Sequence, residues 1–138
     1  MDKEVVVRSE LTDAMVGAGE ALTRRLDERK WPVVASLWFF FPDVDRWKLI
    51  LASPTVAEEG PREAYKTIRD VINEMPEEEP HLGLHDIKVT DPENDLLQRM
   101  STSIGTVPGV KQMRISQNVM NGSLIEDTLI YRLNLQPE

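Results

Sequence analysis

Two histidines are the first residues in this sequence that could do chemistry. His81 and His85 are the only histidines of the chain, and a spacing of four would bring them together on a helix as metal ligands. Pro80 and Gly83 oppose a helix in this segment, and on an extended strand the two histidines would lie about 13 Å apart. We therefore expect no metal site and no cofactor here.

Two acidic residues and a lysine form the sharpest enzymatic pattern. Pro42-Asp43, together with Asp86 and Lys88, is similar to a nuclease motif in which two carboxylates hold Mg²⁺ and a lysine assists the attacking water. The motif usually has its two parts on adjoining strands, whereas a predicted helix and strand intervene here. A metal-dependent nuclease-like enzyme is therefore kept as an alternative, and we expect the carboxyl groups of Asp43 and Asp86 to lie too far apart to share a metal ion.

Two further patterns suggest anion binding but are better explained by helix ends. The loop 105–109 has two glycines, yet it follows a predicted helix, and no Lys-Ser/Thr pair completes a phosphate-binding loop. Arg24, Arg25, Arg29 and Lys30 crowd the end of another predicted helix, where positive charge complements the helix dipole. We therefore assign no catalytic residue and no cofactor-binding residue.

Periodicity predicts the order αββαβαββ. Apolar spacings and cap residues place a first helix from Ser9 to about Arg29, strands at 33–41 and 46–51, a helix from 60 to 75, a strand at 84–90, a helix from 91 to 104, and two final strands joined at 121–122. This order predicts an α+β fold, with one mixed five-stranded sheet and helices mainly on one face. Helical connections favour parallel strands and hairpins require antiparallel ones. We interpret residues 1–138 as a single domain.

Composition and charge limit the function. The chain has no cysteine, 41% hydrophobic residues and a net charge of −8, and residues 54–100 hold 12 acidic but only 5 basic residues. This excess repels phosphate backbones, so we expect no nucleic-acid partner. We expect the acidic run 77–79 to be a solvated loop. The acidic start is not typical of a secretory signal, and the apolar run 33–41 is too short to span a membrane, so we expect a soluble, cytoplasmic protein.

Several segments carry a resemblance. The pattern of residues 105–133, with Pro108-Gly109, Asn121-Gly122 and Ile130-Tyr131-Arg132, resembles a group of small bacterial proteins without an assigned activity. Residues 38–43 and 59–65 look similar to that group too. The resemblance covers most of the chain and implies a bacterial cytoplasmic protein. It supplies no catalytic residues.

The two central strands predict an aromatic hairpin. If a four-residue turn pairs Phe41 with Arg46, one face carries a large apolar set: Val34, Trp38, Phe40, Trp47, Leu49 and Leu51. The other face carries Val33, Leu37, Phe39, Phe41 and Ile50, with Arg46 and Lys48 at its rim. Helices can cover one face. The first helix or the C-terminal segment could cover the other face, which would otherwise form a contact between subunits or with a partner.

The final hairpin contains Asn121-Gly122, which usually forms a two-residue turn. That register would divide the apolar residues between two faces. A three-residue loop, 120–122, instead places them all on one face: Met113, Ile115, Val119, Ile125, Leu129, Tyr131 and Leu133. We therefore predict the three-residue loop.

These observations favour a small non-catalytic interaction or regulatory domain, which self-associates as a homo-oligomer, such as a homodimer, or binds a protein partner. The predicted interface consists of Leu37, Phe39, Phe41, Arg46, Lys48 and Ile50. Phe39→Glu is expected to shift such an oligomer towards monomer. A small-ligand-binding module is a third possibility.

Overall fold

The computed structural model describes residues 10–116, 118–120, 123–125 and 127–136, with side chains outside 117–126. The helices are α1 (Asp13–Glu28), α2 (Pro54–Glu59), α3 (Pro61–Glu74) and α4 (Asp95–Ile104), with a 3₁₀ turn, η1 (Leu84–Asp86). The strands are β1 (Ala35–Phe41), β2 (Arg46–Ala52), β3 (Ile87–Thr90), β4 (Met113–Ile115), β5 (Asn118–Met120), β6 (Ser123–Ile125) and β7 (Thr128–Leu133).

Five strands form one mixed sheet in the order β3-β2-β1-β7-β4, which confirms the predicted α+β class. β2 and β3 are parallel neighbours, as expected from their helical connection. The second helical connection differs from the prediction, because β3 and β4 lie at opposite edges and run in opposite directions. The reason is that β7 pairs with β1, and β4 pairs with the other side of β7 at the far edge of the sheet. Most residues of β7 are buried, so β7 needs cover on both faces.

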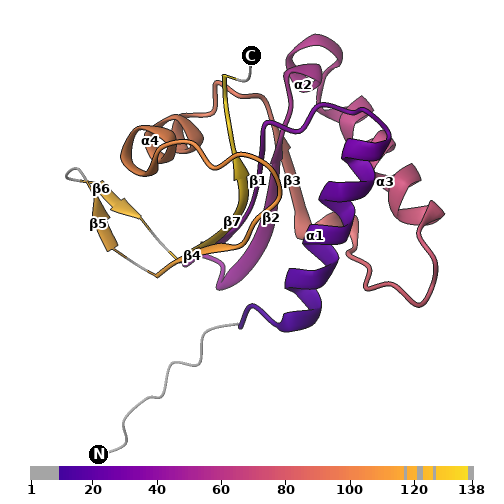
Figure 1. Ribbon diagram of the computed structural model, residues 1–138, viewed down its shortest axis with the longest axis horizontal. Helices are drawn as coiled ribbons and strands as arrows, with labels where there is room; N and C mark the ends of the chain where they lie inside the picture. Colours follow the sequence, from indigo (N-terminus) through magenta and orange to yellow (C-terminus); the bar gives the residue numbers. More distant parts are fainter. Residues whose placement is uncertain (1–9, 117, 121–122, 126, 137–138) are drawn as a thin grey trace, which may run out of the picture.

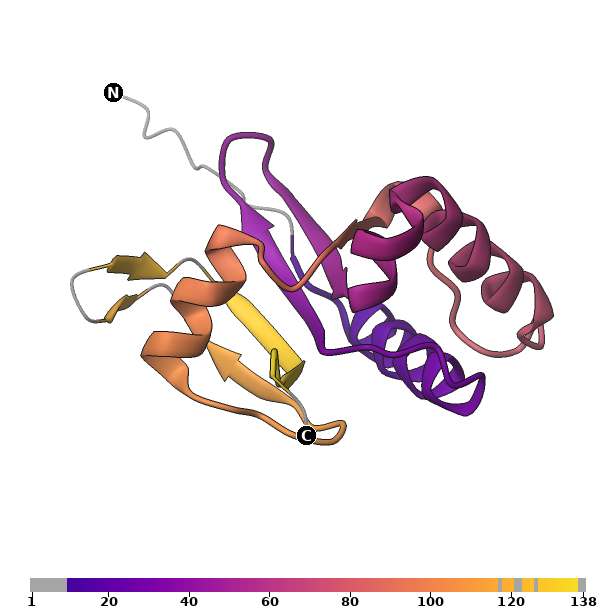
Figure 2. The ribbon, with the colours of Figure 1, turned by 90° about the horizontal axis from the view of Figure 1, so that it is seen from above.

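The helices divide unequally between the two faces of the sheet (Figure 1). α1, α2 and α3 pack on one face through the α1-side cluster, whose helical members are Ala18, Leu22, Leu26, Val56, Ala64, Ile68 and Val71. α4 packs on the other face through the α4-side cluster, to which it contributes Leu97 and Met100. The β5–β6 hairpin lies on the same side as α4 (Figure 2). Helices are therefore mainly on one face, as predicted.

Cap residues explain where two of the helices begin. α1 starts after Thr12, whose hydroxyl accepts a hydrogen bond from the Met15 N–H at 3.1 Å. The predicted cap, Ser9, lies outside the described residues. The short helix α2 was not predicted, although Ser53 caps it by accepting from the Thr55 N–H at 3.2 Å and Pro54 is its first residue. No helix in the described part of the chain is long and apolar enough to cross a membrane.

The aromatic hairpin has the predicted register. Phe41 pairs with Arg46, and Phe40 pairs with Trp47. Val33 and Val34 are the exceptions to the predicted faces, because Val33 belongs to the α1-side cluster and Val34 to the α4-side cluster. Both residues precede β1, which begins at Ala35. The alternation of a regular strand therefore does not extend to them.

A β-bulge changes the alternation of β7. Ser36 pairs with Arg132 while Leu37 pairs with Ile130, so Tyr131 is an extra residue on β7. Tyr131 and Arg132 consequently both reach α1: the Tyr131 hydroxyl donates to the Val16 carbonyl, and Arg132 donates to Asp27 at 2.8 and 2.9 Å. Leu133 belongs to the α4-side cluster, although we predicted it on the face of Tyr131.

The predicted three-residue loop of the final hairpin is wrong. β5 pairs with β6 with Met120 opposite Ser123, which leaves two residues between the strands. In the main sheet Arg114, and not Met113 or Ile115, lies opposite Leu129. The turn residues 121–122 and the side chains of Val119 and Ile125 lie outside the described part. The prediction failed because it assumed one continuous pair of strands, whereas the segment forms two separate pairs.

Candidate functional site

The predicted interface is largely buried within the chain itself. Leu37, Phe39 and Ile50 are 0%, 7% and 3% exposed, and all three belong to the α4-side cluster beneath α4. We expected α1 or the C-terminal segment to cover this face. The C-terminal segment contributes Leu135, but α1 contributes nothing among the described residues, and α4 supplies Leu97 and Met100 instead. Phe39 therefore cannot serve as an interface probe, because Phe39→Glu would place a carboxylate in the core.

One end of this hairpin remains at the surface. Phe41 is half-buried, and Val44 in the turn is 58% exposed. Lys88 of the neighbouring strand places its Nζ 5.5 Å from the centre of the Phe41 ring, while Arg46 and Lys48 project from β2 on the same face. We call these five residues the hairpin end. It retains Phe41, Arg46 and Lys48 of the predicted interface.

The residues of the nuclease pattern lie on three different elements. Asp43 is exposed in the turn between β1 and β2. Asp86 ends η1, where its carboxylate accepts the Gly83 N–H at 3.1 Å and lies 3.3 Å from His85 Nε2. Lys88 lies over the Phe41 ring. The described residues contain no group of three or more His, Asp or Glu side chains that could hold a metal ion.

The two remaining sequence patterns have structural roles. Gly105 ends α4 with φ of 92°, a left-handed conformation that favours glycine. The basic residues near the end of α1 form ion pairs, because Arg25 contacts Glu79 and Arg29 contacts Glu74 at 3.1 Å. Glu79 belongs to the acidic run that we expected to be solvated, so that expectation is wrong for this residue. These pairs join the end of α1 to the end of α3 and the loop that follows.

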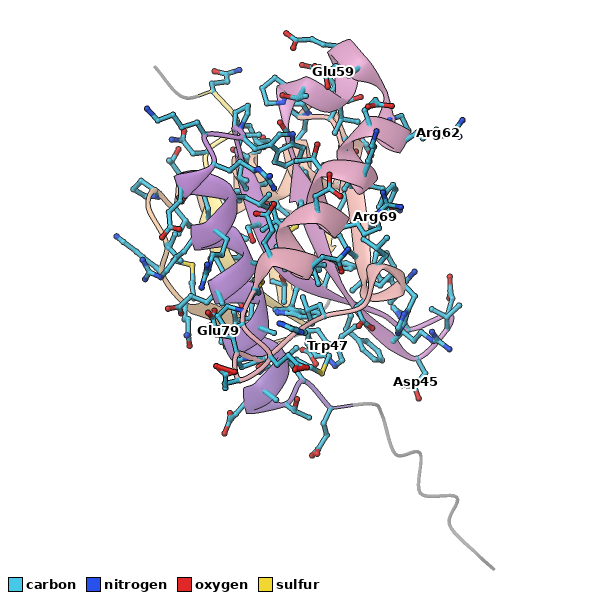
Figure 3. All side chains as sticks on the ribbon, turned by 90° about the vertical axis from the view of Figure 1, so that its right-hand side faces the viewer. Asp45, Trp47, Glu59, Arg62, Arg69 and Glu79 are labelled. Carbon is cyan, nitrogen blue, oxygen red and sulfur yellow. The ribbon has the colours of Figure 1, made fainter. Side chains whose placement is uncertain are left out.

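A basic hollow on α3 was not predicted. Arg62, Lys66 and Arg69 lie at spacings of four and three on one helical face, and with Glu63, Tyr65 and Leu84 they line a hollow of about 530 Å³. Arg62 and Arg69 extend to the same side of the molecule (Figure 3). We call this feature the α3 groove. The signal that could have revealed it is the basic spacing itself, since positions three and four apart share a face of a helix.

A second hollow, of about 540 Å³, lies where the start of α1 approaches the sheet. Arg114 of β4 stacks on Trp47 of β2, with its guanidinium carbon 5.3 Å from the ring centre. Glu10, Asp13 and Asp127 also line the hollow. The single arginine is therefore surrounded by acidic side chains, which makes this hollow unsuitable for an anion.

The buried polar groups form a network under α1. Trp38 Nε1 donates to the Tyr131 hydroxyl at 3.0 Å, and that hydroxyl donates to the Val16 carbonyl. Burial raises the pKa of Tyr131 well above its usual value. Thr23 and Ser36 share a hydrogen bond of 2.7 Å nearby. These groups are fully paired and lie in the core, so they hold α1 on the sheet.

Comparisons with known proteins add no family to this geometry. No protein-family model, no curated protein and no solved structure matches the chain at a significant level. The resemblance to small bacterial proteins therefore stays a prediction.

Proposed function

We propose that this chain is a non-catalytic interaction domain that self-associates through the hairpin end. The observation that carries the proposal is the exposure of an apolar residue, Val44, beside the half-buried ring of Phe41. Aromatic and arginine side chains are enriched in protein interfaces, and the hairpin end supplies both. The interface is smaller than the one predicted from the sequence, because α4 covers the rest of that face.

The charges around this surface favour a second copy as the partner. Arg46 and Lys48 lie on one strand of the hairpin, and the acidic Asp43 lies in its turn. In a two-fold dimer the same patch faces itself, so a patch needs both signs of charge to be self-complementary. The hairpin end meets this condition only together with the neighbouring Asp43, since its own charged residues are all positive. Because the surface is small, we expect a weak dimer, with a dissociation constant in the micromolar range.

Sedimentation velocity over a range of concentrations tests this proposal with a matched pair of variants. Val44→Glu adds a negative charge at the hairpin end, and Met113→Glu adds the same charge at β4. Val44 and Met113 are the exposed large hydrophobic residues of the described part, at 58% and 40%. We expect Val44→Glu to shift the protein to monomer and Met113→Glu to leave the association unchanged.

Two results would contradict the proposal. One is an unmodified protein that remains monomeric at high micromolar concentration. The other is an association that both variants weaken equally, which would indicate a general effect of added negative charge. Either result would remove the hairpin end as a self-association surface.

A further inference from the structure

The α3 groove gathers most of the positive charge of the most acidic part of the chain. Residues 54–100 contain 5 basic residues in total, and Arg62, Lys66 and Arg69 are among them. All three line the same hollow. Because they stand one helical turn apart, their charged groups form a single row along α3. Like charges at this spacing destabilise a helix slightly.

The cations of the α3 groove also lack the kind of carboxylate partner that five other arginines have. Arg24, Arg25, Arg29, Arg99 and Arg132 each lie within 4.0 Å of a carboxylate from another turn or element. Among the described side chains, Arg62 and Lys66 have no such partner. Arg69 has only its neighbour Asp70, at 3.9 Å. Three cations and one carboxylate, that of Glu63, line the groove. The groove therefore keeps a net positive charge in a chain with a net charge of −8.

The wall of the α3 groove is partly apolar and fixed in position. The Tyr65 hydroxyl accepts the Val89 N–H at 3.2 Å and donates to the Ile87 carbonyl at 3.3 Å, so the ring is held against β3. Leu84 of η1 contributes an aliphatic side chain. The hollow of about 530 Å³ lies within the usual range for small-molecule sites. It can accept a small organic molecule whose charged groups face the cations.

Acidic residues at both ends limit the length of the ligand. Glu58 and Glu59 are exposed on α2, directly before α3, and Figure 3 shows Glu59 beyond Arg62 at the top of the helix. Asp70 follows Arg69 on α3. An extended polyanion such as a nucleic acid would run from the basic row into these carboxylates and be repelled. A compact anion would stay between them and meet only one carboxylate among the lining residues, that of Glu63.

We propose that the α3 groove binds a small organic anion with two or more phosphate or carboxylate groups. Arg62, Lys66 and Arg69 contact the charged groups, because guanidinium and ammonium groups form strong hydrogen bonds with both kinds of anion. Tyr65 and Leu84 contact the organic part. This site is independent of the hairpin end, so it can succeed or fail without affecting the proposed self-association.

Isothermal titration calorimetry tests the proposal with three probes: ADP, inorganic pyrophosphate and citrate. ADP and citrate separate a phosphate ligand from a carboxylate ligand, and pyrophosphate shows what the organic part of ADP contributes. We expect saturable binding of at least one probe with a stoichiometry of one. Arg62→Ala and Lys66→Ala should each weaken it about tenfold, which is the usual effect of removing one charged hydrogen bond.

Arg24→Ala is the matched control. Like the two test variants, it removes one positive charge from an exposed helical position, and alanine favours the helix in every case. We expect Arg24→Ala to change the affinity by less than about twofold, since Arg24 lies on α1 outside the groove. Circular dichroism of each variant establishes that it is folded.

Three results would overturn the proposal. The first is the absence of saturable binding by all three probes at millimolar concentration. The second is an equal loss of binding in Arg24→Ala and the groove variants, which would indicate attraction by overall charge. The third is a short single-stranded oligonucleotide that binds more tightly than every probe and depends on Arg62 and Lys66, because the groove would then serve a nucleic acid.

Discussion

The two faces of the sheet are held by different kinds of contact. On the α1 side, helices of 16 and 14 residues cover the strands, and buried hydrogen bonds join Trp38, Tyr131 and the backbone of α1. On the α4 side, a single helix of 10 residues covers the same strands. Its core is formed by apolar side chains and by the buried Thr128, whose hydroxyl donates to the Trp38 carbonyl at 2.6 Å. Buried hydrogen bonds therefore join a helix to the strands on the α1 side, whereas the α4 side depends more on apolar burial.

This difference explains why one end of the aromatic hairpin is exposed. A helix of ten residues is about 15 Å long, whereas seven-residue strands such as β1 and β2 extend over about 23 Å. α4 therefore cannot cover the whole hairpin. Phe39 is buried and Phe41, two residues further along the same face, is only half-buried. The exposed part of the α4 side begins between these two phenylalanines.

The largest effect is expected from a substitution on the α4 side, next to the limit between its buried and its exposed part. Phe39→Glu replaces a ring that is 7% exposed with a carboxylate among apolar side chains. We expect a loss of more than about 4 kcal/mol in the free energy of unfolding. Phe41→Glu should cost less than half as much, because its carboxylate can reach water. Urea denaturation followed by circular dichroism measures both, and equal losses would place Phe41 in the core as well.

A smaller effect is expected on the α1 side, where α1 lies close to the sheet at Gly19. A Cβ at Gly19 would lie 2.6 Å from the Tyr131 hydroxyl and 2.8 Å from Trp38 Nε1. We expect Gly19→Ala to lower the unfolding free energy by about 1–3 kcal/mol through overpacking. Gly17→Ala is the control on the same helix, where the added Cβ meets only Pro80 Cγ at 3.9 Å. It should stabilise the protein by about 0.5–1 kcal/mol. Similar effects at both glycines would contradict the close approach of α1.

The smallest effect concerns the buried hydroxyl of Tyr131. Tyr131→Phe leaves Trp38 Nε1 without its acceptor, so we expect a loss of about 1–2 kcal/mol at neutral pH.

The same group makes stability depend on pH. Burial raises the pKa of Tyr131 in the folded protein, whereas in the unfolded chain a tyrosine titrates near about pH 10. The neutral Tyr131 hydroxyl therefore contributes fully to the free energy of unfolding below about pH 10. Above that pH this contribution falls, by up to about 1.4 kcal/mol per pH unit. Urea denaturation between neutral pH and pH of about 11 should show a shallower decline for Tyr131→Phe than for the unmodified protein. Parallel declines would mean that Tyr131 ionises as easily when folded.

Local features of the fold could be predicted from the sequence. The spacing of Leu22 and Leu26 places α1 on the sheet, and the four-residue turn sets the hairpin register through Phe41 and Arg46. Gly105 ends α4 as expected. Each of these depends on residues that are close in the sequence. Helix periodicity and turn length act at that range.

The errors arose where distant segments meet. Nothing local indicates that β7 pairs with β1 or that a bulge at Tyr131 moves Leu133 to the other face. The burial of the predicted interface likewise depends on α4, which is about 60 residues away from β1 along the chain. The α3 groove differs, because the spacing of Arg62 and Lys66 was visible. What could not be predicted was that neither residue would form an ion pair within 4.0 Å with a described carboxylate.

Tyr65 also affects whether a second copy of the chain can pair with the edge of the sheet. β3 is an edge strand, and an edge strand presents unpaired peptide groups on which another chain can extend the sheet. The phenolic oxygen occupies two of these groups, the Ile87 carbonyl and the Val89 N–H. It thus stands in for a neighbouring strand. A second chain that approached this edge would therefore find these two peptide groups already hydrogen-bonded, which makes extension of the sheet at β3 less favourable.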